Sequence, residues 1–483
     1  MALVEVPKEF PTKLFINGEF VDAGDKRTFD NINPATEDVI APIAMAGKPD
    51  LDAAIDAAKK AQPDWGSAPP AKRASAIWKV GDEIMKRRHE FAALEAMDSG
   101  KPYRECYSID VPMTADHFKY FAGVLRSLQG ETIPVNDNLF VYTLREPLGI
   151  VAGITPWNFP MMMAARKIAP AIAAGNAIIL KPASPTPLTA LLMAECIAAA
   201  KVPAGIVAVL NGKGSEVGQA IVEHPDIAAI SLTGSTSVGV KMIKDAAPTL
   251  KKLTMELGGK SPNVIFADAD VEMAVKGAQA AIFYNKGEVC TAGSRLLVEE
   301  KVYDEAVEKL AARAGKMVQG DPLDDECRYG PQNNKSQFDT TMGYIEKGKA
   351  EGAKLVAGGT RMGDKGYYVA PTVFADCTPD MTIVKEEIFG PVLAVQKFSD
   401  FDDLVAKANS SEYGLAAGVW TRDVSKAHRY AKAVKAGSVW VNCYNWYDSA
   451  VPYGGYKQSG YGREMGLQGL ANMTQTKSVW VQL

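Results

Sequence analysis

The chain has 483 residues, of which 47% are hydrophobic and 23% are charged, and its formal net charge is −4. This length exceeds a single hydrophobic core, so we expect more than one structural unit. No block of five or more basic residues occurs, which argues against nucleic acid as a partner. The apolar stretches are too short to span a bilayer and the N-terminus lacks a signal-peptide pattern, so a cytoplasmic protein is predicted.

The spacing of the cysteines and histidines does not indicate a disulfide framework or a metal site. The six cysteines are far apart and include no CxxC pair, and the four histidines have no ligand-like spacing. We therefore expect reduced cysteines, no disulfide framework and no metal site.

Periodic segments predict helices and strands in chain order. Amphipathic helices are expected at 50–61, 71–85 and 88–97, followed by an extended segment at 132–145. Apolar runs then predict strands at 148–154, 176–180, 206–210, 228–232 and 251–257. The segments between them predict helices at 159–174, 187–200, 214–223 and 236–247. Strands separated by helices imply a parallel sheet with helices on both faces.

A second alternating region begins near Ser261. It predicts strands at 262–267, 294–300, 354–359, 371–377, 392–398 and 438–442, with helices at 271–284, at 302–317 and from Phe401. The last residues, 474–483, alternate as a strand does. This strand and the one at 132–145 fall outside both α/β units and need a partner edge, so a homo-oligomer is expected.

Three motifs contain candidates for chemistry. Cys290 lies in the loop NKGEVCTAGSR between a predicted helix and strand, where a reactive thiol or a buried structural cysteine are both possible readings. Asn158 in TPWNFP follows a predicted strand end, which suits an oxyanion donor or a simple Asx turn. Glu256 in MELGG lies at the end of another strand, where it could be a base with a raised pKa or a capping residue.

Two glycine-rich segments could bind phosphate. Residues 212–218 and 234–239 each close a strand and open a helix, which favours anion binding by helix N-terminal amides. Neither matches GxGxxG. Lys181, in KPAS after another strand, could meet an adenosine ribose or its phosphate.

Together with EEIFGPV at 386–392 and PYGGYKQSGYGRE at 452–464, these motifs resemble the aldehyde dehydrogenase superfamily over essentially the whole chain. The resemblance implies an α/β fold with a Rossmann-like parallel-sheet cofactor domain formed by 1–127 and 148–258. A second α/β catalytic domain would span 259–460. A small β extension at 128–147 and 468–483 would join copies into a homodimer or homotetramer.

The resemblance also implies a mechanism. Cys290 would attack the aldehyde, Asn158 would hold the oxyanion, and Glu256 would activate water to hydrolyse the thioester. Lys167 and Glu464 match a proton relay. Contacts to NAD or NADP would come from Ile154, Thr155, Trp157, Lys181, Ser184, Gly214, Gly234, Ser235, Gly239, Leu257, Glu387 and Phe389. The aldehyde would meet Met113, Phe159, Met162, Arg166, Tyr284, Val289, Thr291, Tyr447 and Tyr453.

Two positions bear on specificity. Ser184 stands where a common family pattern has a glutamate that binds the adenosine ribose, so NADP should be accepted. Arg166 matches an arginine with which succinic semialdehyde dehydrogenases grip a carboxylate, although Tyr284 replaces their second arginine. The substrate is therefore an aromatic or medium-chain aldehyde, or an acid semialdehyde held by Arg166. A third reading pairs Arg166 with a carboxylate of the protein.

Rival readings of the family are a CoA-acylating enzyme and a non-catalytic relative. Glu256 argues against the first, because hydrolysis by water needs a base, and the intact set of Asn158, Glu256 and Cys290 argues against the second. Lys286 and Glu288, charges beside the thiol, either tune it or face solvent.

Overall fold

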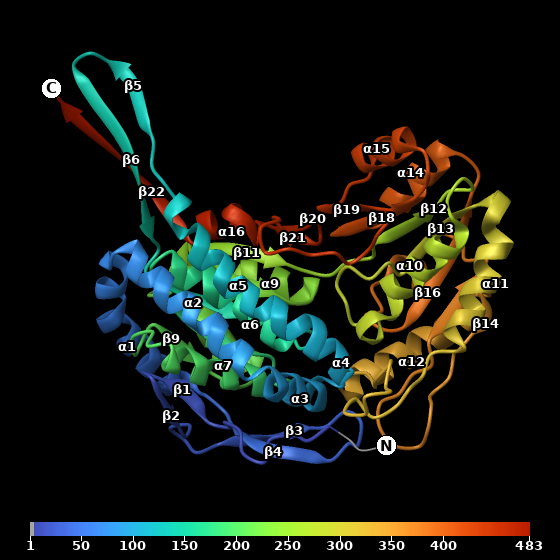
Figure 1. Ribbon diagram of the computed structural model, residues 1–483, viewed down its shortest axis with the longest axis horizontal. Coiled ribbons are helices and arrows are strands. Elements are labelled where there is room, and N and C mark those ends of the chain that lie inside the picture. Colours follow the sequence, from blue (N-terminus) through green and yellow to red (C-terminus); the bar gives the residue numbers. More distant parts are fainter. Residues whose placement is uncertain (1–3) are drawn as a thin grey trace.

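Two large sheets and one small projecting sheet organise the chain in the computed structural model, which describes residues 4–483 (Figure 1). The first sheet has the order β2-β1-β9-β8-β7-β10-β11-β21. Its five central strands are parallel and match the five predicted strands: β7 (Ile150–Ile154), β8 (Ala177–Lys181), β9 (Val207–Val209), β10 (Ala229–Thr233) and β11 (Lys252–Glu256). Helices cover both faces, so these strands are continuous apolar runs.

The edges of this sheet come from distant parts of the chain. β1 (Leu14–Ile16) and β2 (Glu19–Val21) add antiparallel strands beside β9. At the other edge, β21 (Gly460–Tyr461) pairs with β11. The pairing of β21 brings a C-terminal segment to the end of the strand that contains Glu256.

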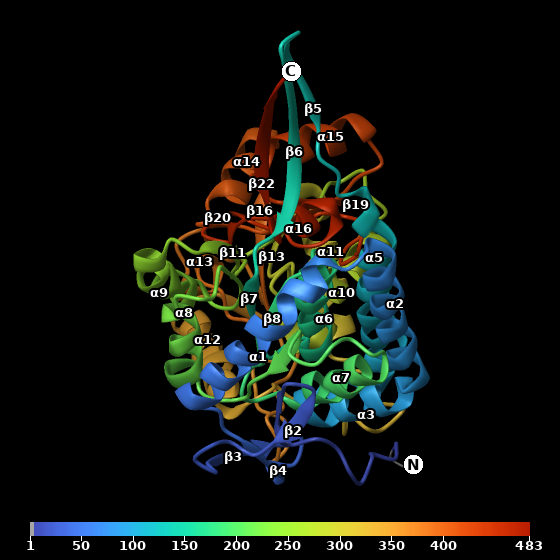
Figure 2. The same cartoon turned by 90° about the vertical axis from the view of Figure 1, so that its left-hand side faces the viewer.

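Helices lie on both faces of the first sheet (Figure 2). α6 (Pro160–Ala173) and α7 (Leu188–Ala199) pack on one face with α2 (Pro70–Lys86), α3 (Arg88–Ser99) and α5 (Val111–Val124), and α8 (Gln219–Glu223) and α9 (Thr236–Ala246) lie on the other. α1 (Lys48–Ser67) also contacts β7 and β8. Every residue of α6 is buried. The predicted helix at 214–223 is a π-helical turn, Gly214–Gly218, that continues into α8.

The second sheet has the order β14-β15-β16-β13-β12-β18-β19. Its strands are β12 (Pro262–Ile265), β13 (Arg295–Glu299), β14 (Lys354–Ala357), β15 (Thr372–Ala375), β16 (Val392–Phe398), β18 (Ala416–Trp420) and β19 (Ser438–Val441). Its helices are α10 (Val271–Phe283), α11 (Tyr303–Ala314), α12 (Lys335–Ala350), α14 (Phe401–Asn409) and α15 (Val424–Ala433). β18, α12 and α15 were not expected from the periodicity, and neither was α5.

The third sheet is a narrow arm that stands away from the body (Figures 1 and 2). It consists of β5 (Thr132–Asn136), β6 (Leu139–Pro147) and β22 (Thr474–Gln482), in the order β22-β6-β5. β22 pairs with β6 over nine residues, from Thr474 opposite Pro147 to Gln482 opposite Leu139. The two predicted segments outside the α/β units thus find a partner edge in each other.

The remaining elements are short. They are β3 (Thr28–Ile32), β4 (Val39–Ala44), α4 (Tyr103–Glu105), a π-helical turn (Cys106–Asp110), α13 (Thr382–Lys385), β17 (Tyr413–Gly414), β20 (Tyr456–Lys457) and α16 (Gly466–Asn472). Between residues 4 and 483, no helix is both long and apolar enough to cross a bilayer.

Candidate active site

The three predicted catalytic residues come from different elements that meet between the two large sheets. Asn158 lies between the end of β7 and the start of α6, and Glu256 is the last residue of β11. Cys290 lies in the loop between α10 and β13. Asn158 and Glu256 therefore lie at the carboxyl ends of two parallel strands of the first sheet, β7 and β11, which are separated by β10. Such strand ends are where α/β proteins bind ligands.

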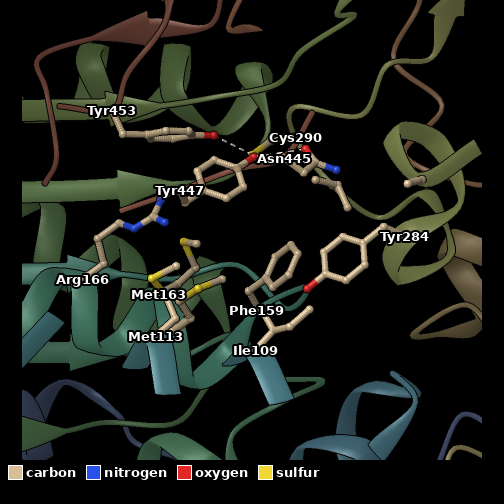
Figure 3. Close-up of a pocket in the computed structure, with 13 residues that line it drawn as sticks. Ile109, Met113, Phe159, Met163, Arg166, Tyr284, Cys290, Asn445, Tyr447 and Tyr453 are labelled. Carbon is tan, nitrogen blue, oxygen red and sulfur yellow. Dashed lines mark hydrogen bonds between the residues drawn. The ribbon is translucent and has the colours of Figure 1, made fainter. Parts of the chain in front are cut away.

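The Cys290 thiol is partly accessible, and its Sγ lies 3.0 Å from the Tyr453 hydroxyl (Figure 3). Burial raises the pKa of this thiol to about 11, although the Tyr453 hydrogen bond and the Arg166 charge both act to lower it. The resting group is therefore a thiol that needs a base before it becomes a nucleophile.

Asn158 is buried and held in one orientation. Its side-chain Nδ2 donates to the Glu288 backbone carbonyl over 2.8 Å, and its backbone carbonyl accepts from Asn285 Nδ2 over 2.9 Å. A side-chain amide has two N–H donors, so one remains for a ligand.

Glu256 is a buried carboxyl whose two oxygens have no hydrogen-bond partner within residues 4–483. Burial, reinforced by the charge of Glu464, raises its pKa well above the ordinary value. A carboxylate in such surroundings binds a proton strongly, as a general base must.

Lys167 and Glu464 form a buried ion pair nearby. Lys167 Nζ donates to Glu464 Oε1 over 2.6 Å and also to Ser231 and Thr233 of β10. Burial lowers the pKa of Lys167. Burial acts to raise the pKa of Glu464, but the charges of Lys167 and Arg166 outweigh it and hold that pKa below its ordinary value.

One cavity of about 190 Å³ opens onto Cys290 (Figure 3). Eight of the nine predicted aldehyde contacts line it: Met113, Phe159, Met162, Arg166, Tyr284, Val289, Tyr447 and Tyr453. The ninth, Thr291, lies outside the lining, buried and with its hydroxyl 2.6 Å from that of Tyr447. The lining also includes Ile109, Met163, Ala280 and Asn445. The run of three methionines at 161–163 could have indicated Met163 as a lining residue, whereas no sequence pattern pointed to Asn445.

Arg166 is the one cation in this lining. It is 4% exposed, and its guanidinium lies 4.9 Å from the centre of the Tyr453 ring. Within residues 4–483 no carboxylate forms an ion pair with it, and its Nε has no hydrogen-bond partner. The reading in which Arg166 pairs with a carboxylate of the protein is therefore wrong, because Glu464 pairs with Lys167 instead.

A second cavity of about 230 Å³ is also lined by Cys290. Six predicted cofactor contacts line it: Trp157, Gly234, Ser235, Leu257, Glu387 and Phe389. Gly259 N donates to Glu387 Oε1 over 2.9 Å, and a Cβ on Gly258 would lie 2.2 Å from Glu387 Oε2. Burial raises the pKa of Glu387 to about 7. The lining residue Gln337 was not predicted.

The other six predicted cofactor contacts lie outside this cavity. Ile154 is the last residue of β7, and Thr155, which follows it, donates from its backbone N to the Lys181 carbonyl over 3.1 Å. Lys181 is buried, which lowers its pKa to about 8, and Ser184 Oγ donates to the Gly212 carbonyl over 2.9 Å. Gly214 begins the π-helical turn, and a Cβ on Gly239 would lie 2.7 Å from Leu257 Cδ1.

The predicted cofactor contacts inside the second cavity and those outside it together suit a nicotinamide dinucleotide. Ser235 is the N-cap of α9, with backbone amides at a helix N-terminus beside the second cavity. Lys181 offers an ammonium with no carboxylate partner in the described residues, and Glu387 offers a carboxylate to ribose hydroxyls. An anion site, a cation and a ribose acceptor are what a dinucleotide needs.

Lys286 and Glu288 are both buried, at 1% and 0% exposure, and lie 3.1 Å apart. The reading in which they face solvent is therefore wrong.

Comparisons with known proteins agree with this arrangement. A model of the aldehyde dehydrogenase family matches residues 20–479. The putative aldehyde dehydrogenase DhaS of Bacillus subtilis is 46% identical over 98% of this chain and 96% of its own. The NAD+ complex of an aldehyde dehydrogenase from Bacillus cereus superimposes with a TM-score of 0.98 at 46% identity over the whole of both chains.

A third relative is the indole-3-acetaldehyde dehydrogenase AldA of P. syringae, solved with NAD+ and IAA. It has a TM-score of 0.97 and 39% identity over 98% of this chain and 97% of that one. The fold, both cavities and these matches lead to one conclusion: the chain belongs to the aldehyde dehydrogenase family, as an enzyme that oxidises an aldehyde with a nicotinamide dinucleotide.

Proposed function

We propose that the enzyme oxidises its aldehyde to a carboxylic acid through a thioester on Cys290. The observation that carries this proposal is that Cys290 lines both cavities, which otherwise share only Met163. An aldehyde in the first cavity and a nicotinamide in the second would meet at this thiol.

In the first step the Cys290 thiol loses its proton to solvent water, and the resulting thiolate attacks the aldehyde carbon, which gives a thiohemiacetal oxyanion. The free N–H of the Asn158 amide and the Cys290 backbone N–H would donate to this oxygen. Asn158 supports this role because its other N–H is already occupied by the Glu288 carbonyl. A donor fixed in advance stabilises charge without reorganising during the reaction.

The cofactor, NAD or NADP, supplies a hydride acceptor when bound. Trp157, Gly234, Ser235, Leu257, Glu387 and Phe389 would hold its nicotinamide end, with Ile154, Thr155, Lys181, Ser184, Gly214 and Gly239 toward its adenosine. Loss of hydride from the thiohemiacetal carbon leaves a thioester on Cys290.

Hydrolysis of the thioester then releases the acid. Glu256 would take a proton from water as its oxygen bonds to the thioester carbon, and the carbon–sulfur bond breaks to restore the Cys290 thiolate. Lys167 and Glu464 would pass that proton onward, since the Glu464 charge already acts on Glu256.

The test follows nicotinamide reduction over a panel of aldehydes, without CoA. Cys290→Ala should abolish turnover. The Glu256→Gln enzyme should reduce one nicotinamide per subunit in a burst, and its steady-state rate should then be lower than that of the native enzyme by about 100-fold or more. Free acid should appear as product. A steady rate in Cys290→Ala, or a requirement for CoA, would refute the proposal.

We propose an aromatic or medium-chain aldehyde as substrate. The first cavity is lined mainly by methionine and aromatic side chains, which suit an apolar chain or ring. The relative from P. syringae is named for an aromatic aldehyde.

Arg166, which has no carboxylate partner in the part of the chain that the structure describes, favours a second candidate, an acid semialdehyde. A buried guanidinium without a carboxylate partner is costly, and a substrate carboxylate in the cavity would supply one. Arg166→Ala, described in the Discussion, separates the two candidates.

We also propose that residues 128–147 and 468–483 join copies into a homodimer or homotetramer. Val135, Phe140, Leu144 and Trp480 on the arm are 41–60% exposed, and both outer edges of this sheet are unpaired in the described chain. Exposed apolar side chains beside unpaired strand edges favour association.

A further inference from the structure

The loop before Cys290 has an unusual backbone. Asn285, Lys286 and Gly287 have φ values of 44°, 60° and 77°, so three successive residues are left-handed and two of them have side chains. A Cβ on Gly287 would lie 2.3 Å from the Gly390 carbonyl carbon, so the loop is also packed tightly against backbone. Such a conformation persists only where the surroundings enforce it.

The buried pair of Lys286 and Glu288 ties this loop to two other segments. Lys286 Nζ donates to the Ser99 carbonyl at the end of α3 over 3.0 Å. Glu288 Oε1 accepts from Asn333 N, just before α12, over 2.8 Å. The two charged groups lie 3.1 Å apart, so the pair forms one continuous bridge from α3 to the α12 segment.

The backbone of Glu288 faces the opposite way, toward the catalytic amide. Its carbonyl accepts from Asn158 Nδ2 over 2.8 Å and from Asn285 Nδ2 over 3.3 Å. The position of this one carbonyl therefore decides where the second N–H of Asn158 points. Cys290 follows only two residues later, so the same anchor also places the thiol.

We propose that Lys286 and Glu288 are positioning residues for catalysis, because their buried bridge holds the Glu288 carbonyl that orients the Asn158 amide toward the oxyanion. The inference rests on the proposed roles of Asn158 and Cys290. Neither charged side chain lines either cavity, so the pair acts through Asn158 without touching substrate or cofactor.

The test is Lys286→Met combined with Glu288→Leu, which removes both charges of the bridge together, so that neither is left buried without its partner. Apolar replacement of both partners of a buried ion pair is often neutral for stability, so this variant should fold. We expect kcat to fall by about tenfold or more, while KM for aldehyde and for NAD changes by less than about threefold.

A double-mutant cycle shows whether the pair acts through Asn158. Asn158→Ala alone should lower kcat by roughly 100-fold or more. Adding the pair substitution to that variant should lower kcat by less than about threefold further, because the amide to be oriented is gone. Full additivity of the two effects, or a native-like kcat in the pair variant, would overturn the proposal.

Two controls separate the possible failures. Leu404→Ala, in a core cluster remote from the loop, should lower Tm without changing kcat at the assay temperature, so lost stability alone does not imitate the expected result. If the native enzyme itself shows no turnover that depends on Cys290, the proposed function fails. If turnover depends on Cys290 and the cycle is additive, only the positioning role fails.

Discussion

At the scale of single residues, the site is governed by desolvation. Cys290 and Glu256 are both pushed toward their neutral forms by burial, and nearby charges then adjust each one. The Tyr453 hydroxyl and the Arg166 guanidinium favour the thiolate, whereas the Glu256 and Glu387 charges oppose it. Reactivity at Cys290 is therefore set by its surroundings as much as by the thiol itself.

The first prediction concerns pH. Because the pKa of Cys290 is raised to about 11, the thiolate fraction is small at neutral pH and grows as pH rises. Alkylation by iodoacetamide should accelerate by about tenfold per pH unit from pH ~7 to ~9.5. Tyr453→Phe should slow alkylation at every pH in this range, since it removes a hydrogen bond that lowers the pKa. A rate that levels off near neutral pH would contradict the prediction.

The second prediction concerns Arg166. If the guanidinium grips a carboxylate, Arg166→Ala should lower kcat/KM for succinic semialdehyde about 100-fold more than for hexanal, since a charge-assisted pair is lost only with the first, whereas any effect through the Cys290 thiolate is shared by both. Steady-state kinetics with both aldehydes measures the ratio. Equal losses for the two would remove the acid-semialdehyde candidate.

The third prediction concerns Ser184. A hydroxyl there tolerates a 2′-phosphate, with the Lys181 ammonium nearby, so NADP should be accepted alongside NAD. Ser184→Glu should lower kcat/KM with NADP by at least about tenfold and leave NAD within about threefold, because a carboxylate repels the phosphate. Parallel assays with both cofactors test it. A native KM for NADP a hundredfold above that for NAD would show the reading of Ser184 to be mistaken.

At the scale of elements, the carboxyl ends of parallel strands position the residues of the site, and side chains from other segments pack closely against the backbone that follows these strands. Glu256 ends β11 and the Gly258–Gly259 segment follows closely, which lets the Glu387 carboxylate reach the Gly259 amide. β21 then covers the end of β11 from a segment more than 200 positions further along the chain, as Glu256 lies opposite Gly460.

The fourth prediction tests the close approach of Glu387 to the Gly258–Gly259 segment. In Gly258→Ala the new Cβ would overlap Glu387 Oε2, so the carboxylate must move away from the cavity. KM for NAD should rise by about tenfold or more while the single-turnover rate at saturating NAD falls less, because binding contacts are lost before chemistry. Gly343→Ala is the matched control, since nothing lies within 4 Å of its Cβ position. A normal KM in Gly258→Ala would mean that Glu387 does not bind the cofactor.

At the scale of the whole molecule, the arm projects away from the hydrophobic cores around the two large sheets. β22 returns from the C-terminus to pair with β6, which places exposed apolar side chains on a sheet that projects from the first unit (Figure 1). A three-stranded sheet is stable when one of its faces is covered by other protein surface. We therefore expect a partner surface to cover the arm.

The fifth prediction tests the arm. Trp480→Glu together with Leu144→Lys should shift the mass measured by light scattering from an oligomer toward a monomer, because charges are added to an interface that must be desolvated. Lys385→Glu, on the exposed end of α13, is a control that should leave the mass unchanged. A monomeric native protein would refute the oligomer proposal directly.

Much of this architecture is encoded locally. Short apolar runs correctly predicted the five central strands of the first sheet, and the helix-length segments between them predicted most of its helices, because a parallel strand covered on both faces is apolar along its whole length. The approximate position of the Cys290 loop between α10 and β13 followed from the same patterns. Helices α5, α12 and α15 escaped because their boundaries depend on what they pack against.

The sequence by itself determined the fold class, the family and the candidate set of Asn158, Glu256 and Cys290, since each follows from motifs whose spacing is local. Tertiary structure alone decided which groups meet: that Arg166 has no carboxylate partner among residues 4–483, that Lys286 and Glu288 are buried as a pair, and that Cys290 lines both cavities. The physical reason is that burial and pairing are properties of segments far apart in the chain. They come into existence only when the two sheets are packed together.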